Sequence, residues 1–138
     1  MNIEGHIVTG TLIAAGVGWW QSPGAGVLVW TGSALIDVDH YLWYAIRFRD
    51  WSLRRAQEFF EAKKANDYYC LCIFHTLEAI ALYIACLWMS GPLFWLAVGC
   101  LTHIVLDVGQ SIWDRGLLLR KWSLIHAILY WKNGRFRR

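Results

Sequence analysis

Apolar residues in this chain run in long blocks, separated by short polar turns and two charged segments. The blocks predict four membrane-spanning helices, at about 7–20, 25–46, 68–89 and 92–113. All but the first approach the roughly 20 residues that a helix needs to cross a bilayer. Gly and Pro in the turns between the blocks favour helix ends there. We therefore expect an all-α, integral membrane four-helix bundle, folded as one membrane-embedded domain over residues 1–138.

The two charged segments predict helices of another kind. In residues 50–66, Trp51, Arg55 and Phe59 repeat at four-residue spacing, as in an amphipathic helix that lies in the membrane interface. The tail segment 117–131 is short and interrupted by charged residues. It is predicted to be a second amphipathic interfacial helix, with a fifth span as the alternative.

Composition and charge support a membrane protein. The 138 residues are 57% hydrophobic and 17% charged, with ten Trp, whereas soluble domains are about 45–50% apolar and ~25% charged. All 13 Lys and Arg fall between Arg47 and Lys64 or from Arg115 to Arg138. Four spans place both segments on one side, which the positive-inside rule makes cytoplasmic, with both termini in the cytoplasm. We expect an inner-membrane protein whose net charge of +3 meets anionic lipid headgroups and not nucleic acid.

No cleaved signal peptide is expected, because the first apolar block lacks a basic segment in front of it. Gly10, Ala14 and Gly18 form a ridge of small residues at four-residue spacing. Such a ridge predicts close packing of the first helix against a neighbour, either within the chain or in a homodimer.

Seven ionisable residues fall inside the predicted spans: Asp37, Asp39, His40, His75, Glu78, His103 and Asp107. One Asp at the centre of a spanning helix costs ~2.5–3.5 kcal/mol, so seven such residues need a common partner. The spans contain no Lys or Arg that could pair with the carboxylates. Because Asp, Glu and His are the usual ligands of zinc and related ions, we infer a bound metal.

The spacing of these residues supports the same inference. Three pairs are three or four residues apart, which places both members on one helix face: Asp37 with His40, His75 with Glu78, and His103 with Asp107. The predicted topology brings the pairs to one depth, and His6 lies at the inner mouth of the first helix. Asp39 is expected either to reach a second ion or to orient a ligand histidine. A proton or ion pathway made of the same residue types is the alternative.

Several of these motifs resemble a known family. Glu4-Gly5-His6, the run Leu35–His40, a histidine early in the third span and His103–Asp107 resemble the membrane-bound metal-dependent hydrolases that include a LexA-regulated inner-membrane protein. That family is similar, distantly, to zinc-dependent phospholipase C. The resemblance implies metal-site positions at His6, Asp37, Asp39, His40, His75, His103 and Asp107. Family members also carry a His-Arg-Gly-x-x-His-Ser run of which only His75 is matched, so Glu78 would replace the missing ligand.

The function expected from these features is hydrolysis of a phospholipid or isoprenoid-phosphate ester near the cytoplasmic face. Zinc is the favoured ion and manganese the second choice, with one or two ions bound and three also compatible with the ligand set. Asp39 or Glu78 would be the catalytic general base. Four basic residues are placed to hold the substrate phosphate, although each also has an ordinary topogenic role: Arg47, Arg49, Arg115 and Lys121.

Two other functions fit the same residues. The first is a small carrier of metal ions or protons, in which the ligands form a transient site. The second is a membrane adaptor without catalytic activity, in which the metal holds short helices together.

Overall fold

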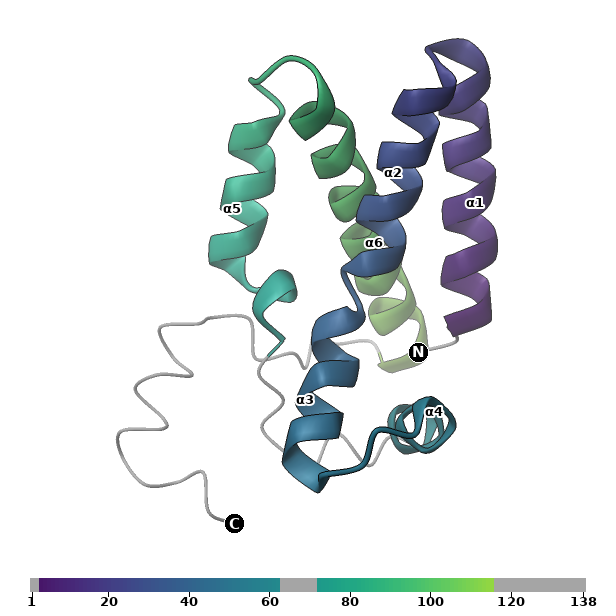
Figure 1. Cartoon of the computed structure of the whole chain (residues 1–138), viewed down its shortest axis with the longest axis vertical. Coiled ribbons are helices and arrows are strands. Elements are labelled where there is room, and N and C mark those ends of the chain that lie inside the picture. The colour runs from purple at the N-terminus through teal and green to yellow at the C-terminus, as the bar shows by residue number, and fades with distance from the viewer. Residues whose placement is uncertain (1–2, 63–71, 116–138) are drawn as a thin grey trace. The chain divides into compact units, whose positions relative to one another are not determined.

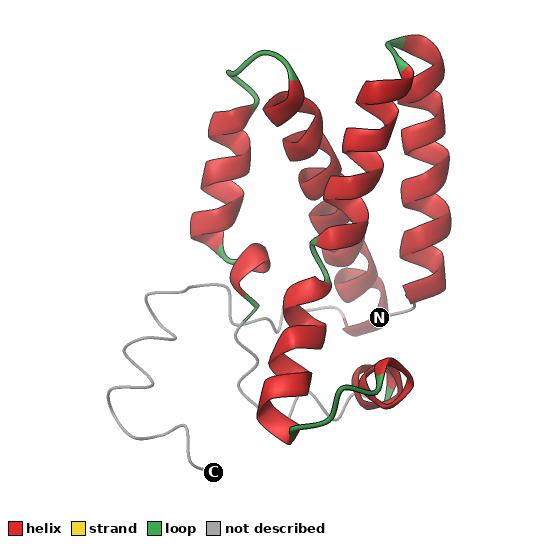
Figure 2. Ribbon diagram, in the orientation of Figure 1, coloured by secondary structure: helices red, strands yellow, loops and turns green. Residues whose placement is uncertain are grey.

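The computed structural model describes residues 3–62 and 72–115. Helices joined by loops make up both ranges (Figure 1), and no strand is present in either of them (Figure 2). The predicted all-α class is confirmed. The chain divides into two compact units, unit 1 with Met1–Ile36 and Ile80–Leu119 and unit 2 with Asp37–Ala79 and Arg120–Arg138. That these units act as a single membrane-embedded domain stays a prediction.

In unit 1, helices α1 (Ile3–Trp20) and α2 (Pro23–Leu35) form an antiparallel pair (Figure 1). The turn between them is built from sequence signals that end one helix and begin another. The Ser22 hydroxyl accepts a hydrogen bond from the Ala25 backbone N–H at 3.2 Å, which satisfies one of the free donors at the helix start. Pro23 occupies the first helical position, where its missing N–H costs nothing.

Small residues allow α1 and α2 to pack closely. A Cβ atom added to Gly26 would lie 2.6 Å from the Ala14 carbonyl oxygen and 2.8 Å from Gly18 Cα, and one added to Gly10 would lie 2.6 Å from Ser33 Oγ. The predicted ridge of small residues therefore packs against α2 within the chain. Its use in a homodimer stays a prediction.

Helix α6 (Pro92–Arg115) packs against α2 through a second pair of glycines. A Cβ atom added to Gly32 would collide with the Leu96 carbonyl oxygen, and one added to Gly99 would collide with the Val29 carbonyl oxygen. The backbones of α2 and α6 are therefore in direct contact at Gly32 and Gly99, where a residue with a side chain would not fit.

Over Pro92–Gln110, α6 is long and apolar enough to cross a membrane, and it is the one helix of the described ranges that meets this test of length and composition. Of the four predicted spans, only the one at 92–113 is therefore supported by a described helix of sufficient length and hydropathy. Helix α5 (Leu77–Cys86) is apolar but short. The boundary between the two units passes through α5, after Ala79.

Two predicted spans differ from the structure. The second span is not one helix over 25–46, because α2 ends at Leu35 and a separate helix, α3, covers Val38–Phe48. The Asp37 carbonyl accepts from the backbone N–H groups of His40 and Tyr41, at 3.1 and 3.4 Å, which starts the first turn of α3. The third span is also interrupted, since a 3-10 turn, η2 (Ile73–His75), precedes α5.

Unit 2 contains a corner between α3 and α4 (Leu53–Glu61). Asp50 fixes the corner: one carboxylate oxygen accepts from the Ser52 backbone N–H at 3.1 Å, and the other accepts from Tyr44 Oη and Arg55 Nε, each at 3.1 Å. Helix α4 lies within the predicted interfacial segment 50–66. The second predicted interfacial helix, 117–131, lies outside the described residues.

A glycine-to-alanine pair tests the close approach of α2 and α6. Gly99→Ala should lower the free energy of unfolding by about 1–3 kcal/mol, since the new Cβ meets the Val29 carbonyl. Gly109→Ala on the same helix meets nothing within 4 Å and should leave stability unchanged or raise it by up to about 1 kcal/mol through helix propensity. Thermal unfolding in detergent measures both, and equal unfolding temperatures for the two variants would contradict the packing.

Candidate metal-binding sites

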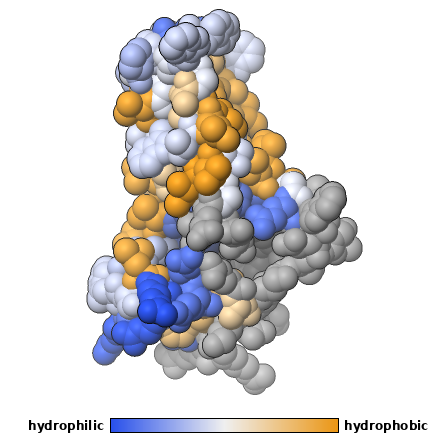
Figure 3. Space-filling view, turned by 90° about the vertical axis from the view of Figure 1, so that its right-hand side faces the viewer, coloured by the Kyte–Doolittle hydropathy of each residue, from blue (hydrophilic) through white to orange (hydrophobic). Residues whose placement is uncertain are grey.

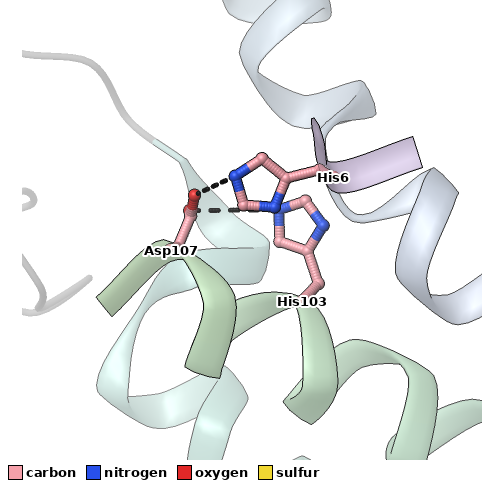
Figure 4. A group of neighbouring side chains, drawn as sticks. All are labelled: His6, His103 and Asp107. Atoms are coloured by element: carbon pink, nitrogen blue, oxygen red, sulfur yellow. Dashed lines mark ion pairs between the residues drawn. The ribbon is translucent and has the colours of Figure 1, made fainter. Parts of the chain in front are cut away.

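The first candidate site lies in unit 1 and consists of His6, His103 and Asp107, here called the unit 1 triad (Figure 4). His6 comes from the first turns of α1, whereas the other two side chains are one turn apart on α6. All three are buried, and His103 is only 1% exposed. Together, these two imidazoles and one carboxylate could hold a metal ion.

Distances within the unit 1 triad fit a metal ion. The Asp107 carboxylate faces one edge of both imidazoles, with Oδ1 3.3 Å from His6 Nε2 and Oδ2 3.9 Å from His103 Nε2 (Figure 4). The two rings stack with their centroids 4.8 Å apart. One potential ligand atom from each residue lies within 4.8 Å of the others. Tetrahedral zinc with bonds of ~2.0–2.1 Å separates its ligand atoms by about 3.3 Å, so small side-chain movements would enclose an ion.

A backbone carbonyl orients His103. Its Nδ1 lies 2.9 Å from the Ser33 carbonyl oxygen, and a carbonyl oxygen only accepts, so this nitrogen carries the proton. In the neutral imidazole, Nε2 then holds the lone pair and is the nitrogen on the side of Asp107. Ser33 is among the last four residues of α2, whose carbonyls have no intrahelical donor. The end of α2 therefore supplies the acceptor that fixes the tautomer of His103.

The second candidate site lies in unit 2 and consists of Asp39, His40 and His75, here called the unit 2 triad. Asp39 and His75 are buried, and Asp39 contacts both histidines. Its Oδ1 lies 2.8 Å from His40 Nδ1, and its Oδ2 lies 3.5 Å from His75 Nδ1. Asp37 is close to the same rings, with Oδ1 3.4 Å from His40 Nδ1 and 3.6 Å from His75 Nε2.

Local backbone structure positions His75 in unit 2. Its neighbour Phe74 donates its backbone N–H to Asp39 Oδ2 at 2.8 Å, which ties the 3-10 turn to α3. Thr76 holds the other end of the turn, because its hydroxyl donates to the Ile73 carbonyl at 3.0 Å and accepts from the Ala79 N–H at 3.3 Å. Thr76 thereby caps α5, which begins at Leu77, and His75 lies outside that helix.

Two of the three predicted pairs are confirmed as neighbours, Asp37 with His40 and His103 with Asp107. The prediction that His75 and Glu78 share one helix face is wrong. His75 lies in η2 and Glu78 lies in α5, with Thr76 in extended conformation between them. Glu78 is half-buried and belongs to neither triad. Its role as ligand or base stays a prediction.

None of the four predicted phosphate-binding residues belongs to a triad of the described residues. Arg47 and Arg49 are exposed at the end of α3, where the Arg47 guanidinium lies 5.9 Å from the centroid of the Phe48 ring. Arg115 ends α6, and Lys121 lies outside the described residues. Phosphate binding by these four residues stays a prediction.

Three residues of the sites were not found by sequence reasoning: Ser33, Thr76 and Gln110. Ser33 acts through its carbonyl, which no sequence motif reports. Thr76 had a signal, since a Thr directly before an apolar run is a helix-capping pattern. Gln110 lies on α6 at Oε1 3.2 Å from His6 Nε2, and its helical spacing from Asp107 could have indicated it.

No family model, curated protein or solved structure matches this chain in the comparisons with known proteins.

The orientation of His103 gives a direct spectroscopic prediction. In metal-free protein labelled with ¹⁵N-histidine, His103 should be the tautomer with the proton on Nδ1, because the Ser33 carbonyl accepts from that nitrogen. Two-bond ¹⁵N–¹H NMR spectra distinguish the tautomers, and the signal missing from His103→Gln assigns the residue. A proton on Nε2 instead would show that the hydrogen bond to Ser33 does not form.

Proposed function

We propose that this chain is a membrane-embedded, metal-dependent hydrolase that acts on a phospholipid or an isoprenoid-phosphate ester near the cytoplasmic face. The observation that carries the proposal is a pair of His/Asp triads, one in each unit, in which every side chain but half-buried His40 is buried. Within each triad, potential ligand atoms lie within 4.8 Å of one another. Buried charges are paired or bind metals, and this donor set of imidazoles and carboxylates suits zinc, with manganese as the second choice.

The distribution of apolar side chains in unit 1 supports a membrane setting. Ile7, Val8 and Leu12 of α1 and Val105 of α6 are exposed, whereas the histidines and the aspartate are buried. Figure 3 shows hydrophobic side chains, in orange, at the molecular surface. Apolar side chains outside and ionisable side chains inside are the arrangement expected in lipid.

Tryptophans support the same setting. Trp19 is 94% exposed at the end of α1, and Trp88 is 90% exposed shortly before α6 begins. The two turns that follow these residues lie at one end of unit 1 (Figure 1), and Trp at a common level is typical of the aromatic belt. His6 lies near the other end of α1, so we place the unit 1 triad towards the cytoplasmic side and the turns outside, with both termini inside.

Unit 2 supports contact with lipid headgroups. Its corner between α3 and α4 exposes Ile46, Trp51 and Leu53, and Arg47 and Arg54 lie exposed on the same two helices. Apolar and basic side chains side by side are typical of surfaces that bind anionic membranes. The substrate would then be a lipid whose phosphate or ester group enters from this interface.

The chemistry divides among the chain's own residues. A bound divalent ion would supply an activated water at neutral pH and polarise an ester oxygen. His6, His103 and Asp107 would hold it in unit 1, and His40 and His75 would do so in unit 2. Because both Asp39 oxygens already contact histidine Nδ1 atoms or the Phe74 N–H, Asp39 is better placed to orient ligands than to take up a proton. We therefore assign the general base to Glu78. The resemblance to the membrane-bound hydrolases supports the reaction class.

Carboxylate-to-amide variants test the assignment. Glu78→Gln should retain metal near the wild-type amount and lose turnover of a phospholipid and polyprenyl-phosphate panel by about 10²–10⁴-fold, the usual effect of a positioned general base. Asp39→Asn should instead reduce metal binding, because the amide orients the two histidines less well. Glu58→Gln is the matched control, since Glu58 is exposed and pairs with exposed Arg54 at 3.0 Å. Turnover and metal content are measured on each purified variant.

The same experiment identifies the rival functions. If the wild-type protein turns over nothing in the panel while proteoliposomes take up zinc or manganese, the carrier function replaces the hydrolase. If metal is bound with neither turnover nor uptake, the adaptor function replaces it.

A further inference from the structure

Gln110 is placed to act on the unit 1 triad. It follows Asp107 by three residues and His103 by seven on α6, a spacing that puts the three side chains on one helix face. Its Oε1 lies 3.2 Å from His6 Nε2, the atom that also faces Asp107 Oδ1 at 3.3 Å. His6 therefore presents one nitrogen to two oxygens.

The chemistry of these atoms fixes the proton on His6. An amide oxygen only accepts, so the contact with Gln110 is a hydrogen bond when His6 Nε2 carries the proton. A neutral imidazole then has its lone pair on Nδ1. In this structure, His6 Nδ1 is buried and has no hydrogen-bond partner among the described residues. A buried lone pair without a donor is costly unless something else occupies it.

We infer that Gln110 is a positioning residue that fixes the tautomer of His6, so that His6 binds the ion of the unit 1 triad through Nδ1. The inference rests on the proposed metal site. His103 has the mirror arrangement, in which Nδ1 donates to the Ser33 carbonyl and Nε2 is the ligand atom. Each histidine thus donates one ring proton to a protein oxygen and keeps its other nitrogen for the metal, as ligating histidines usually do.

Gln110 also keeps the Asp107 carboxylate available. Without an amide oxygen at position 110, Asp107 Oδ1 at 3.3 Å is the acceptor left for the His6 Nε2 proton. The same carboxylate must bind the ion, so metal and proton would compete for it. Loss of the Gln110 oxygen should therefore weaken metal binding although Gln110 is not itself a ligand.

The test compares variants of the full-length protein in detergent by zinc titration. Gln110→Leu, which keeps the size of the side chain without the acceptor, should weaken zinc binding in unit 1 by about 10–100-fold, the usual cost of losing a residue that orients a ligand. Gln110→Glu keeps an oxygen at this position and should bind zinc nearly as tightly as the wild type. Gln21→Leu, at an exposed glutamine in the turn after α1, is the matched control and should change nothing.

A spectroscopic readout separates positioning from a general loss of structure. With ¹¹³Cd and ¹⁵N-histidine, coupling to the metal should appear at Nδ1 of His6 and at Nε2 of His103. In Gln110→Leu without metal, the ¹⁵N signal of His6 Nε2 should shift because its proton is then accepted by Asp107 Oδ1 alone, while the His103 tautomer is unchanged. Metal coupling at His6 Nε2 in the wild type would overturn the inference, as would zinc binding by Gln110→Leu equal to that of the wild type. If the wild type itself binds no zinc or cadmium, the proposed function fails as well.

Discussion

The hydrogen bond from His103 Nδ1 to the Ser33 carbonyl is the interaction on which the unit 1 site depends. It joins α6 to the end of α2 at 2.9 Å, inside an interior where His103 is only 1% exposed. Gly32 and Gly99 make it possible, because any larger residue would separate the two backbones. Ser33 is among the last four residues of α2, whose carbonyls have no intrahelical donor, so its carbonyl is well placed to accept from His103. The packing of α2 against α6 and the position of the α2 C-terminus therefore both determine the hydrogen bond that orients His103.

In both triads, oxygen atoms contact ring nitrogens of the histidines, but the oxygens belong to different chemical groups. In unit 1, neutral oxygens orient the histidines: a backbone carbonyl for His103 and an amide for His6. In unit 2, the Asp39 carboxylate contacts the Nδ1 atoms of both His40 and His75. A carboxylate is the stronger acceptor and makes its histidines more basic ligands, whereas neutral acceptors leave the charge of the ion to be balanced by Asp107. The two sites would accordingly differ in affinity for the same ion.

The elements that depend on a repeating pattern of apolar residues could be predicted from the sequence. The features that depend on single hydrogen bonds, such as where a helix begins, could not. The all-α class and the His103–Asp107 pair follow from apolar blocks and four-residue spacing, and both are confirmed. The break between α2 and α3 lies at Asp37, which was interpreted as a metal ligand inside a span and not as the residue before a new helix. The separation of His75 from Glu78 depends on Thr76, whose hydroxyl caps α5. Ser33 and Gln110 were missed because they contact the triad histidines through a backbone carbonyl and an amide oxygen, which are not the residue types that a search for metal ligands selects.

The most direct test of the proposed metal sites is the metal content of the full-length chain purified in detergent, measured by elemental analysis for the wild type, His103→Ala and His126→Ala. No Asp or Glu lies within ten positions of His126 in the sequence, which makes it a matched histidine control. The wild type and His126→Ala should contain zinc or manganese in a fixed ratio to protein, and His103→Ala should contain less because the unit 1 triad has lost a ligand. Metal-free wild-type protein whose unfolding temperature does not change with chelator or added zinc would contradict the account.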